Sequence, residues 1–196
     1  MASVRFDRRY YDRYYFDLKT RVHGPRELGR LGAFVCAYLK YLQQPVRTVL
    51  DLGCGIGLWK PVIARHFPRA EYTGVEVSSY LCRRYGWERG SVVDYRGEPA
   101  DLVVCQSVLQ YLDAPAARRA IENLARHCAG ALYLEVPTPR DWIETCDQER
   151  TDGDIYLRSA AWYRRELRRH FTSCGGGLFL ARDSPVILYT LERSAL

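Results

Sequence analysis

The chain has 196 residues, of which 47% are apolar and 27% charged, which fits one globular domain able to bury roughly 70% of its unfolded surface. This composition excludes a disordered chain, a collagen-like repeat and a disulfide-rich miniprotein. The longest apolar runs, such as 31–39, are far shorter than the roughly twenty residues that span a bilayer, so no membrane helix is expected.

Charge and cysteine usage indicate the compartment and the partners. The first twenty residues lack the apolar core of a secretory signal, and the seven cysteines form no close pair, so we expect a cytoplasmic protein with reduced thiols and no metal site. The net charge is +6, but the basic residues are spread along the chain. The clearest cluster, at 164, 165, 168 and 169, has the spacing of a solvated helix face, which makes a nucleic-acid partner possible but not favoured.

The first half of the element order is a helical cap followed by alternating strands and helices. Apolar side chains repeat every 3.6 residues over 26–42, which predicts an amphipathic helix, and with the aromatic segment before it this forms an N-terminal cap over residues 1–44. Strands are predicted over 48–52, 71–77, 91–93, 102–106 and 131–136, and helices over 58–66, 79–85 and 114–128. This alternation predicts a doubly wound, mostly parallel α/β sheet within a domain of residues 45–196.

The end of the chain breaks this alternation. A helix over about 159–170 precedes two strand-like runs, 178–181 and 186–192. The connection between the two runs is too short for a crossover helix, so we expect an antiparallel hairpin and a seven-stranded sheet with a reversed final strand.

The most informative stretch is the turn after the predicted strand 48–52. It contains Asp51, Gly53, Cys54, Gly55 and Gly57. Glycines let the backbone turn sharply and let a ligand approach without an intervening Cβ. A dinucleotide-binding turn would need its third glycine where Leu58 stands, so a nicotinamide dehydrogenase ranks last. An acid two residues before three alternating glycines resembles the class I S-adenosylmethionine-dependent methyltransferase family.

The resemblance covers roughly residues 46–136 and implies S-adenosylmethionine as cofactor, with the glycine turn under its methionine end. Glu76, followed by Val77, ends the second predicted strand, where a carboxylate can accept both ribose hydroxyl protons. Asp94 follows the third predicted strand, and the resemblance implies that this position holds the adenine amino group. Tyr95 would then border the adenine ring. The end of the fourth predicted strand supplies three further candidates at the cofactor edge, Gln106, Ser107 and Val108.

Two segments unlike the core are expected to cover the substrate side: the aromatic arm at 10–16 and an insertion at about 137–163. Tyr11 and Tyr15 of the arm are candidates to face the cofactor, because aromatic faces attract a sulfonium cation. The alternative is that these tyrosines only pack the arm against the domain. Arg21 is expected to pair with the carboxylate of the cofactor.

A general base is needed only if the acceptor must lose a proton. Glu135 and His23 are the candidates, with Asp141 and Glu144 as further carboxylates near the same sheet edge. For Glu135, a purely structural hydrogen bond at the end of a strand is the alternative.

These features predict an enzyme that transfers a methyl group from S-adenosylmethionine to a small-molecule acceptor by in-line displacement. Two alternatives remain. One is a methyltransferase acting on RNA or protein, which the arginine clusters at 8, 9 and 13 and at 164, 165, 168 and 169 would favour. The other is a non-catalytic cofactor-binding scaffold that activates a partner. The acceptor and the oligomeric state are left open.

Overall fold

The structure is a computed structural model that describes residues 5–21 and 24–193. The helical elements are α1 (Arg8–Tyr11), the π-helical turn η1 (Asp12–Phe16), α2 (Pro25–Tyr41), α3 (Trp59–His66), α4 (Ser79–Tyr85), the 3-10 turn η2 (Leu109–Tyr111), α5 (Ala114–His127), α6 (Pro139–Glu144) and α7 (Ala160–Leu167). The strands are β1 (Thr48–Leu52), β2 (Glu71–Glu76), β3 (Glu88–Arg89), β4 (Ala100–Gln106), β5 (Cys128–Glu135), β6 (Phe171–Gly175) and β7 (Leu178–Ala181). None of the helices in these ranges is long and apolar enough to cross a membrane.

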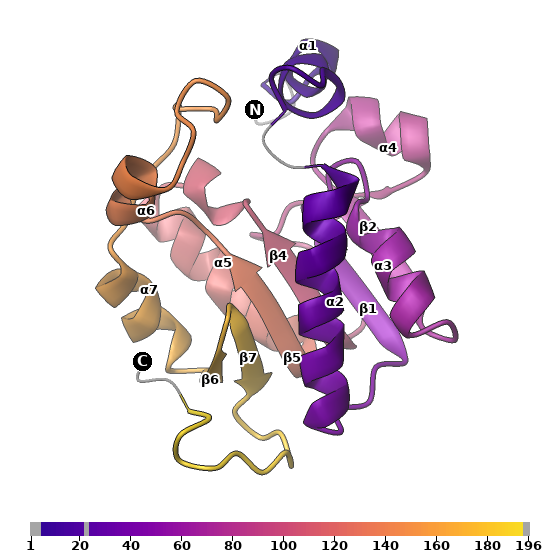
Figure 1. The fold of residues 1–196 in the computed structure, drawn as a ribbon, viewed down its shortest axis with the longest axis vertical. Helices are drawn as coiled ribbons and strands as arrows, with labels where there is room; N and C mark the ends of the chain where they lie inside the picture. The colour runs from indigo at the N-terminus through magenta and orange to yellow at the C-terminus, as the bar shows by residue number, and fades with distance from the viewer. Residues whose placement is uncertain (1–4, 22–23, 194–196) are drawn as a thin grey trace.

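The strands form one seven-stranded sheet in the order β3-β2-β1-β4-β5-β7-β6 (Figure 1). Strands β1 to β5 pair in parallel, and β7 runs antiparallel to both of its neighbours. The predicted α/β sheet with a reversed strand is therefore confirmed. The strand order reverses between β1 and β4, and open α/β sheets bind ligands at the carboxyl ends of the strands beside such a reversal.

Helices cover both faces of the sheet, as the alternation of buried residues along β4 shows. Val103 and Cys105 belong to the apolar cluster with α5 and α7, whereas Leu102 and Val104 belong to the cluster with α2 and α3. A strand that is apolar on both faces is the pattern of a buried parallel strand, because each face needs its own helical cover.

The C-terminal hairpin is present, but its first strand differs from the prediction. The hairpin partner of β7 is β6, whereas residues 186–192 form no strand. Gly176 and Gly177 have φ values of 59° and 77°, which a two-residue hairpin turn requires at both positions. With β5 on one side of β7 and β6 on the other, no edge of β7 is left for a later segment.

The third strand also lies elsewhere than predicted. It is β3, whose two residues pair with Val75 and Glu76, and residues 92–94 form a turn. The Trp87 side chain explains the shift, because its ring lies against Gly74 and its Nε1 donates to the Gly55 carbonyl at 3.0 Å. These contacts place the next two residues beside β2, and the tertiary environment overrides the strand preference of Val92 and Val93.

The N-terminal region consists of α2, which packs on one face of the sheet, and of the arm formed by residues 5–16. Helix α2 begins after Gly24, whose amide donates to the Glu27 carboxylate, and has Pro25 in its first turn. The arm lies above the carboxyl ends of the strands next to α4 (Figure 1), and Ser78 Oγ at the start of α4 donates to the Phe6 carbonyl. The arm thus covers the edge of the sheet where ligands bind.

Candidate functional site

The glycine turn after β1 forms the floor of a cavity at this edge. Gly53, Gly55 and Gly57 all have positive φ values, of 83°, 55° and 76°. Gly53 and Gly55 line the cavity, and a Cβ at Gly53 would overlap the Val108 side chain. A Cβ at Gly57 would instead overlap the Trp87 ring, so the third glycine serves packing beneath the turn. The turn therefore needs glycine both for its dihedral angles and for its close contacts.

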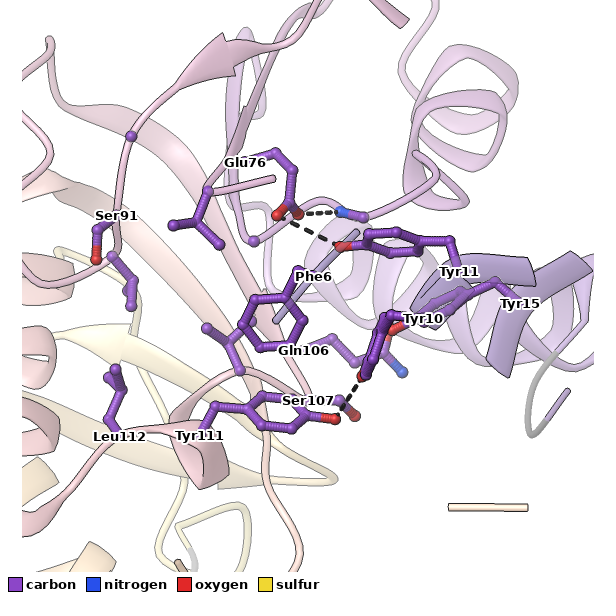
Figure 2. A pocket seen from close by; sticks show the side chains of 16 residues that line it. Phe6, Tyr10, Tyr11, Tyr15, Glu76, Ser91, Gln106, Ser107, Tyr111 and Leu112 are labelled. Carbon is purple, nitrogen blue, oxygen red and sulfur yellow. Dashed lines mark hydrogen bonds between the residues drawn. The ribbon is translucent and has the colours of Figure 1, made fainter. Parts of the chain in front are cut away.

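Glu76 is the charged group that faces this cavity, and it is only 4% exposed. Its carboxylate accepts hydrogen bonds from the Gly55 and Ser78 amides, both at 2.9 Å. The Tyr11 hydroxyl lies 3.5 Å away and points to the same carboxylate (Figure 2). Burial raises the pKa of Glu76, and these hydrogen bonds act in the opposite direction. Among the described residues no cationic side chain forms an ion pair with it, so the carboxylate keeps acceptor capacity for a ligand.

Asp51 lies behind the turn and lines a smaller cavity together with Cys54 and Trp59. It is 2% exposed and accepts a hydrogen bond from the Tyr72 hydroxyl. Burial raises the pKa of Asp51 to about 7, the bond from Tyr72 counteracts this, and the nearby Glu76 charge adds to it. Two buried carboxylates without ion-pair partners in the described chain thus flank the glycine turn.

The wall opposite β2 comes from the end of β4. Gln106, Ser107 and Val108 all line the first cavity, and Val77 lines it from the β2 side. Gln106 is fixed at both ends, since its Oε1 accepts from Trp59 Nε1 at 2.8 Å and its Nε2 lies 3.2 Å from the Glu135 carboxylate. Ser107 has a φ of 55°, which is unusual for a residue other than glycine. Gln106 is thus held between α3 and β5.

The arm closes the cavity from above. Phe6, Tyr10, Tyr11 and Tyr15 line it, and Tyr11 is 3% exposed (Figure 2). The Tyr10 and Tyr111 hydroxyls are 2.8 Å apart, which joins the arm to η2. The predicted candidates Tyr11 and Tyr15 are thus at the cavity, together with aromatic residues that the sequence did not single out.

Other predicted residues lie away from the cavity. Asp94 and Tyr95 are not among the lining residues within the described ranges, where Gly90, Ser91 and Val92 occupy that side instead. Tyr95 donates to the Glu88 carboxylate at 2.8 Å and stacks near His127. The reason is the position of β3, which ends two residues before Ser91 and so moves Asp94 into the following turn.

Arg21, the predicted partner of the cofactor carboxylate, and His23, a candidate general base, have different outcomes. Arg21 lies beside Gly24 and Glu27 at the start of α2 and lines none of the cavities at this edge, as far as residues 5–21 and 24–193 are concerned. His23 falls outside the described residues.

A second cavity of about 620 Å³ adjoins the first, and Tyr10, Tyr15, Ser107 and Tyr111 line both. Glu135 faces this second cavity and accepts hydrogen bonds from Tyr133 at 2.9 Å, from Gln106 and from Ser107 at 3.3 Å. Asp141 also lines it, whereas Glu144 pairs with Arg140. The arrangement is that of two adjoining sites separated by aromatic and hydroxyl side chains.

Buried Arg158 supports η2, whose Gln110 and Tyr111 line the second cavity, and nothing in the sequence distinguishes this arginine. The guanidinium donates to the Leu109 and Leu112 carbonyls and to the Tyr163 hydroxyl, and it lies over the Trp162 ring. It therefore ties the segment after α6 to η2. An arginine among many is not distinguishable from a surface residue until its carbonyl partners are known.

Comparison with known proteins identifies the family. The sequence model of a family described as a methyltransferase domain matches residues 8–176. The chain belongs to this family, and its fold is that of the class I S-adenosylmethionine-dependent methyltransferases, so the resemblance seen in the sequence is confirmed.

Several relatives and solved structures are similar over part or most of the chain. A trans-aconitate 2-methyltransferase of Pseudomonas paraeruginosa (strain DSM 24068 / PA7) is 28% identical over 162 residues, which are 78% of this chain and 50% of that protein. A ubiquinone biosynthesis O-methyltransferase of Xylella fastidiosa (strain 9a5c) is 32% identical over 48% of this chain and 44% of its own length. The chain thus spans about half the length of these curated relatives.

Among solved structures, the magnesium protoporphyrin IX methyltransferase of Synechocystis PCC 6803 with bound SAH has a TM-score of 0.64 at 18% identity. The match covers 92% of this chain and 96% of that one. This likeness concerns the fold.

Proposed function

We propose that this protein transfers the methyl group of S-adenosylmethionine to a small-molecule acceptor. The observation that carries the proposal is Glu76, a buried carboxylate without an ion-pair partner in the described chain, placed between the glycine turn and the cavity. A carboxylate with free lone pairs suits the two adjacent hydroxyls of a ribose. When bound, the cofactor supplies an electrophilic methyl group on a sulfonium sulfur.

The remaining cavity residues have proposed roles that follow from their positions. Gly53 and Gly55, with Asp51 and Cys54 behind them, leave room along the backbone for the methionine part of the cofactor. Ser91 and Val92 border the adenine in place of Asp94 and Tyr95. The Tyr11 and Tyr15 rings are suited to face a sulfonium cation.

Methyl transfer requires alignment and exclusion of water more than acid–base chemistry. The arm excludes water, because its aromatic side chains cover the first cavity. Ser107, which lines both cavities, and Gln106, which lines the first, donate to Glu135. We propose Glu135 as the group that accepts a proton when the acceptor must lose one. Three hydrogen-bond donors orient this carboxylate without an ion pair among the described residues.

The experiment that tests the proposal is calorimetric titration with S-adenosylhomocysteine of the wild type, Glu76→Gln and the matched control Glu71→Gln. Glu71 is an exposed acid at the opposite end of β2. Loss of hydrogen bonds to a charged group costs about 1.5–3 kcal/mol, so Glu76→Gln should weaken binding by roughly 10- to 100-fold while Glu71→Gln leaves it unchanged. A wild type that binds neither S-adenosylhomocysteine nor S-adenosylmethionine would contradict the proposal.

The arginine cluster gives no support to the nucleic-acid alternative. The arginines at 164, 165, 168 and 169 are exposed, but Glu166 between them forms ion pairs with Arg118, Arg165 and Arg169 at 3.5, 3.2 and 3.1 Å. Part of the positive charge is therefore compensated within the fold. The seven cysteines are all free, which supports the proposal of a reducing cytoplasmic location.

A further inference from the structure

The second cavity carries a one-sided set of charges. The charged residues that line it are Glu135, Asp141, Asp147 and Asp152, and no lysine, arginine or histidine of the described chain joins them in the lining. An anionic acceptor would meet four carboxylates here, and no cationic side chain of the described residues lines the cavity to receive it. The charge of the lining therefore favours a cationic molecule.

These carboxylates are not equally available. Asp152 pairs with Arg5 at 2.8 Å, and Asp147 with Arg150 at 3.4 Å. Glu135 and Asp141 accept only neutral donors within residues 5–21 and 24–193, so both keep an uncompensated charge. Both carboxylates influence the Cys146 thiol on the cavity wall. Burial is the main cause that raises the pKa of this thiol, and the charges of Asp141 and Glu135 raise it further.

Two buried polar side-chain atoms on this cavity lack a hydrogen-bond partner among the described residues. Gln110 is 5% exposed, and its Oε1 and the Thr151 hydroxyl are the buried side-chain polar atoms of the described chain for which no partner exists. Both residues line the second cavity. Buried polar groups are rarely left unpaired, because each costs about 1–3 kcal/mol. An amide oxygen can be satisfied only by a donor, so a ligand with N–H or O–H groups would complete this wall, and an ammonium N–H would form the stronger, charge-assisted bond.

The boundary with the first cavity also suits a cation. The rings of Tyr10 and Tyr15 line both cavities. Aromatic faces attract ammonium groups within about 6 Å of the ring centre. Carboxylates, an unpartnered amide oxygen and aromatic rings thus surround one volume next to the cofactor cavity.

We infer that the acceptor is an amine, which binds as its ammonium form in this cavity, with Gln110 and Asp141 recognising its N–H groups. The inference rests on the proposed methyl transfer and adds the class of acceptor. The ammonium proton leaves to Glu135, which restores the nitrogen lone pair. The nitrogen then forms a bond to the methyl carbon as the carbon–sulfur bond breaks, with its electron pair remaining on sulfur. The products are a methylated ammonium ion and S-adenosylhomocysteine.

The first test measures binding of three matched series, with and without saturating S-adenosylhomocysteine. The probes are benzylamine, benzyl alcohol and benzoate, their 2-naphthyl counterparts, and the corresponding propyl compounds. We expect at least one amine to bind about tenfold more tightly than its alcohol and its carboxylate, as a charged hydrogen bond provides. Equal binding of amines and alcohols, or tighter binding of the carboxylates, would overturn the inference.

The second test uses variants that separate recognition from folding. Gln110→Leu removes the unpartnered oxygen, so it should keep or raise the melting temperature while the preference for amine over alcohol falls about tenfold. Asp141→Asn should lower that preference about threefold, whereas its control Asp113→Asn, at the cap of α5, should not change it. If the variants change the melting temperature but leave the preference for amine over alcohol unchanged, Gln110 and Asp141 have only a structural role.

The two proposals fail in different ways. Failure of the wild type to bind S-adenosylhomocysteine contradicts the methyltransferase proposal, and the amine preference is then still measured on the cofactor-free protein. Normal cofactor binding without amine preference contradicts the acceptor class alone.

Discussion

The glycine-turn side of the site and the acceptor side are held in place by different parts of the chain. On the glycine-turn side, backbone at the ends of β1 and β2 sets the geometry, and the Glu76 carboxylate accepts directly from backbone amides. On the acceptor side, the wall comes from the arm, from η2 and from the segment after β5. Side chains hold it together, since Tyr10 joins the arm to η2 and Arg158 joins the segment after α6 to η2. A site made by backbone is encoded in glycine spacing, whereas one made by side chains depends on partners far apart in the sequence.

The largest effect on stability and cofactor binding is expected from a substitution on the glycine-turn side of the site. Gly53→Ala combines a φ of 83° with overlap against Val108, and these should together cost roughly 3 kcal/mol of unfolding free energy. Cofactor affinity should fall with it, because the added methyl group also narrows the cavity. Urea unfolding and titration with S-adenosylhomocysteine measure the two effects.

Gly86→Ala is the matched control for this change. Gly86 has a φ of 74° at the end of α4, but nothing lies within 4 Å of its added Cβ. It should cost roughly 1 kcal/mol from its dihedral angle alone and leave cofactor affinity unchanged. Equal effects of the two substitutions would show that contact with Val108 is unimportant.

A smaller loss of unfolding free energy is expected from a substitution on the acceptor side of the site. Arg158 is 9% exposed, and lysine cannot reproduce its planar set of donors to the Leu109 and Leu112 carbonyls. Arg158→Lys should cost about 2 kcal/mol of unfolding free energy and reduce acceptor binding more than cofactor binding. The exposed neighbour Arg164, replaced by lysine, should change neither. If Arg158→Lys weakens cofactor binding as much as Gly53→Ala does, the two sides are not independent.

The same contrast explains how much of the fold could be predicted. Helix α4 and strand β1 have the predicted bounds, since their signals are local: a cap, an apolar run and a turn. Strand β3 could not be found because Trp87, through contacts with Gly55 and Gly74, decides which residues lie beside β2. The β6–β7 hairpin does carry a local signal in its consecutive glycines, but the alternating run at 186–192 resembles a strand more strongly, and this made the predicted second strand wrong.

The site shows the same division. The predicted Gly53, Gly55, Glu76 and Ser107 all line the cavity, because motifs at strand ends fix both sequence position and place. Phe6, Tyr111 and Arg158 come from the arm, η2 and the segment before α7, whose relative placement depends on long-range contacts. No spacing rule connects residues that are about a hundred positions apart.

The pH dependence of stability provides the last way to sharpen the comparison. Asp51 on the glycine-turn side is buried without an ion-pair partner in the described chain, and its pKa of about 7 lies above the ordinary value of 3.8. The folded protein therefore holds this proton more tightly than the unfolded chain, so the contribution is fully present below about pH 4 and is lost as the pH rises towards 7. Over that window the unfolding free energy should fall by about 1 kcal/mol per pH unit from this group, and the raised pKa of Glu76 acts in the same direction. Asp51→Asn should flatten the dependence measured by urea unfolding from pH 4.5 to 7.5. The same slope in both proteins would show that Asp51 is ionised throughout. Burial on the glycine-turn side of the site would then not favour the protonated carboxyl group.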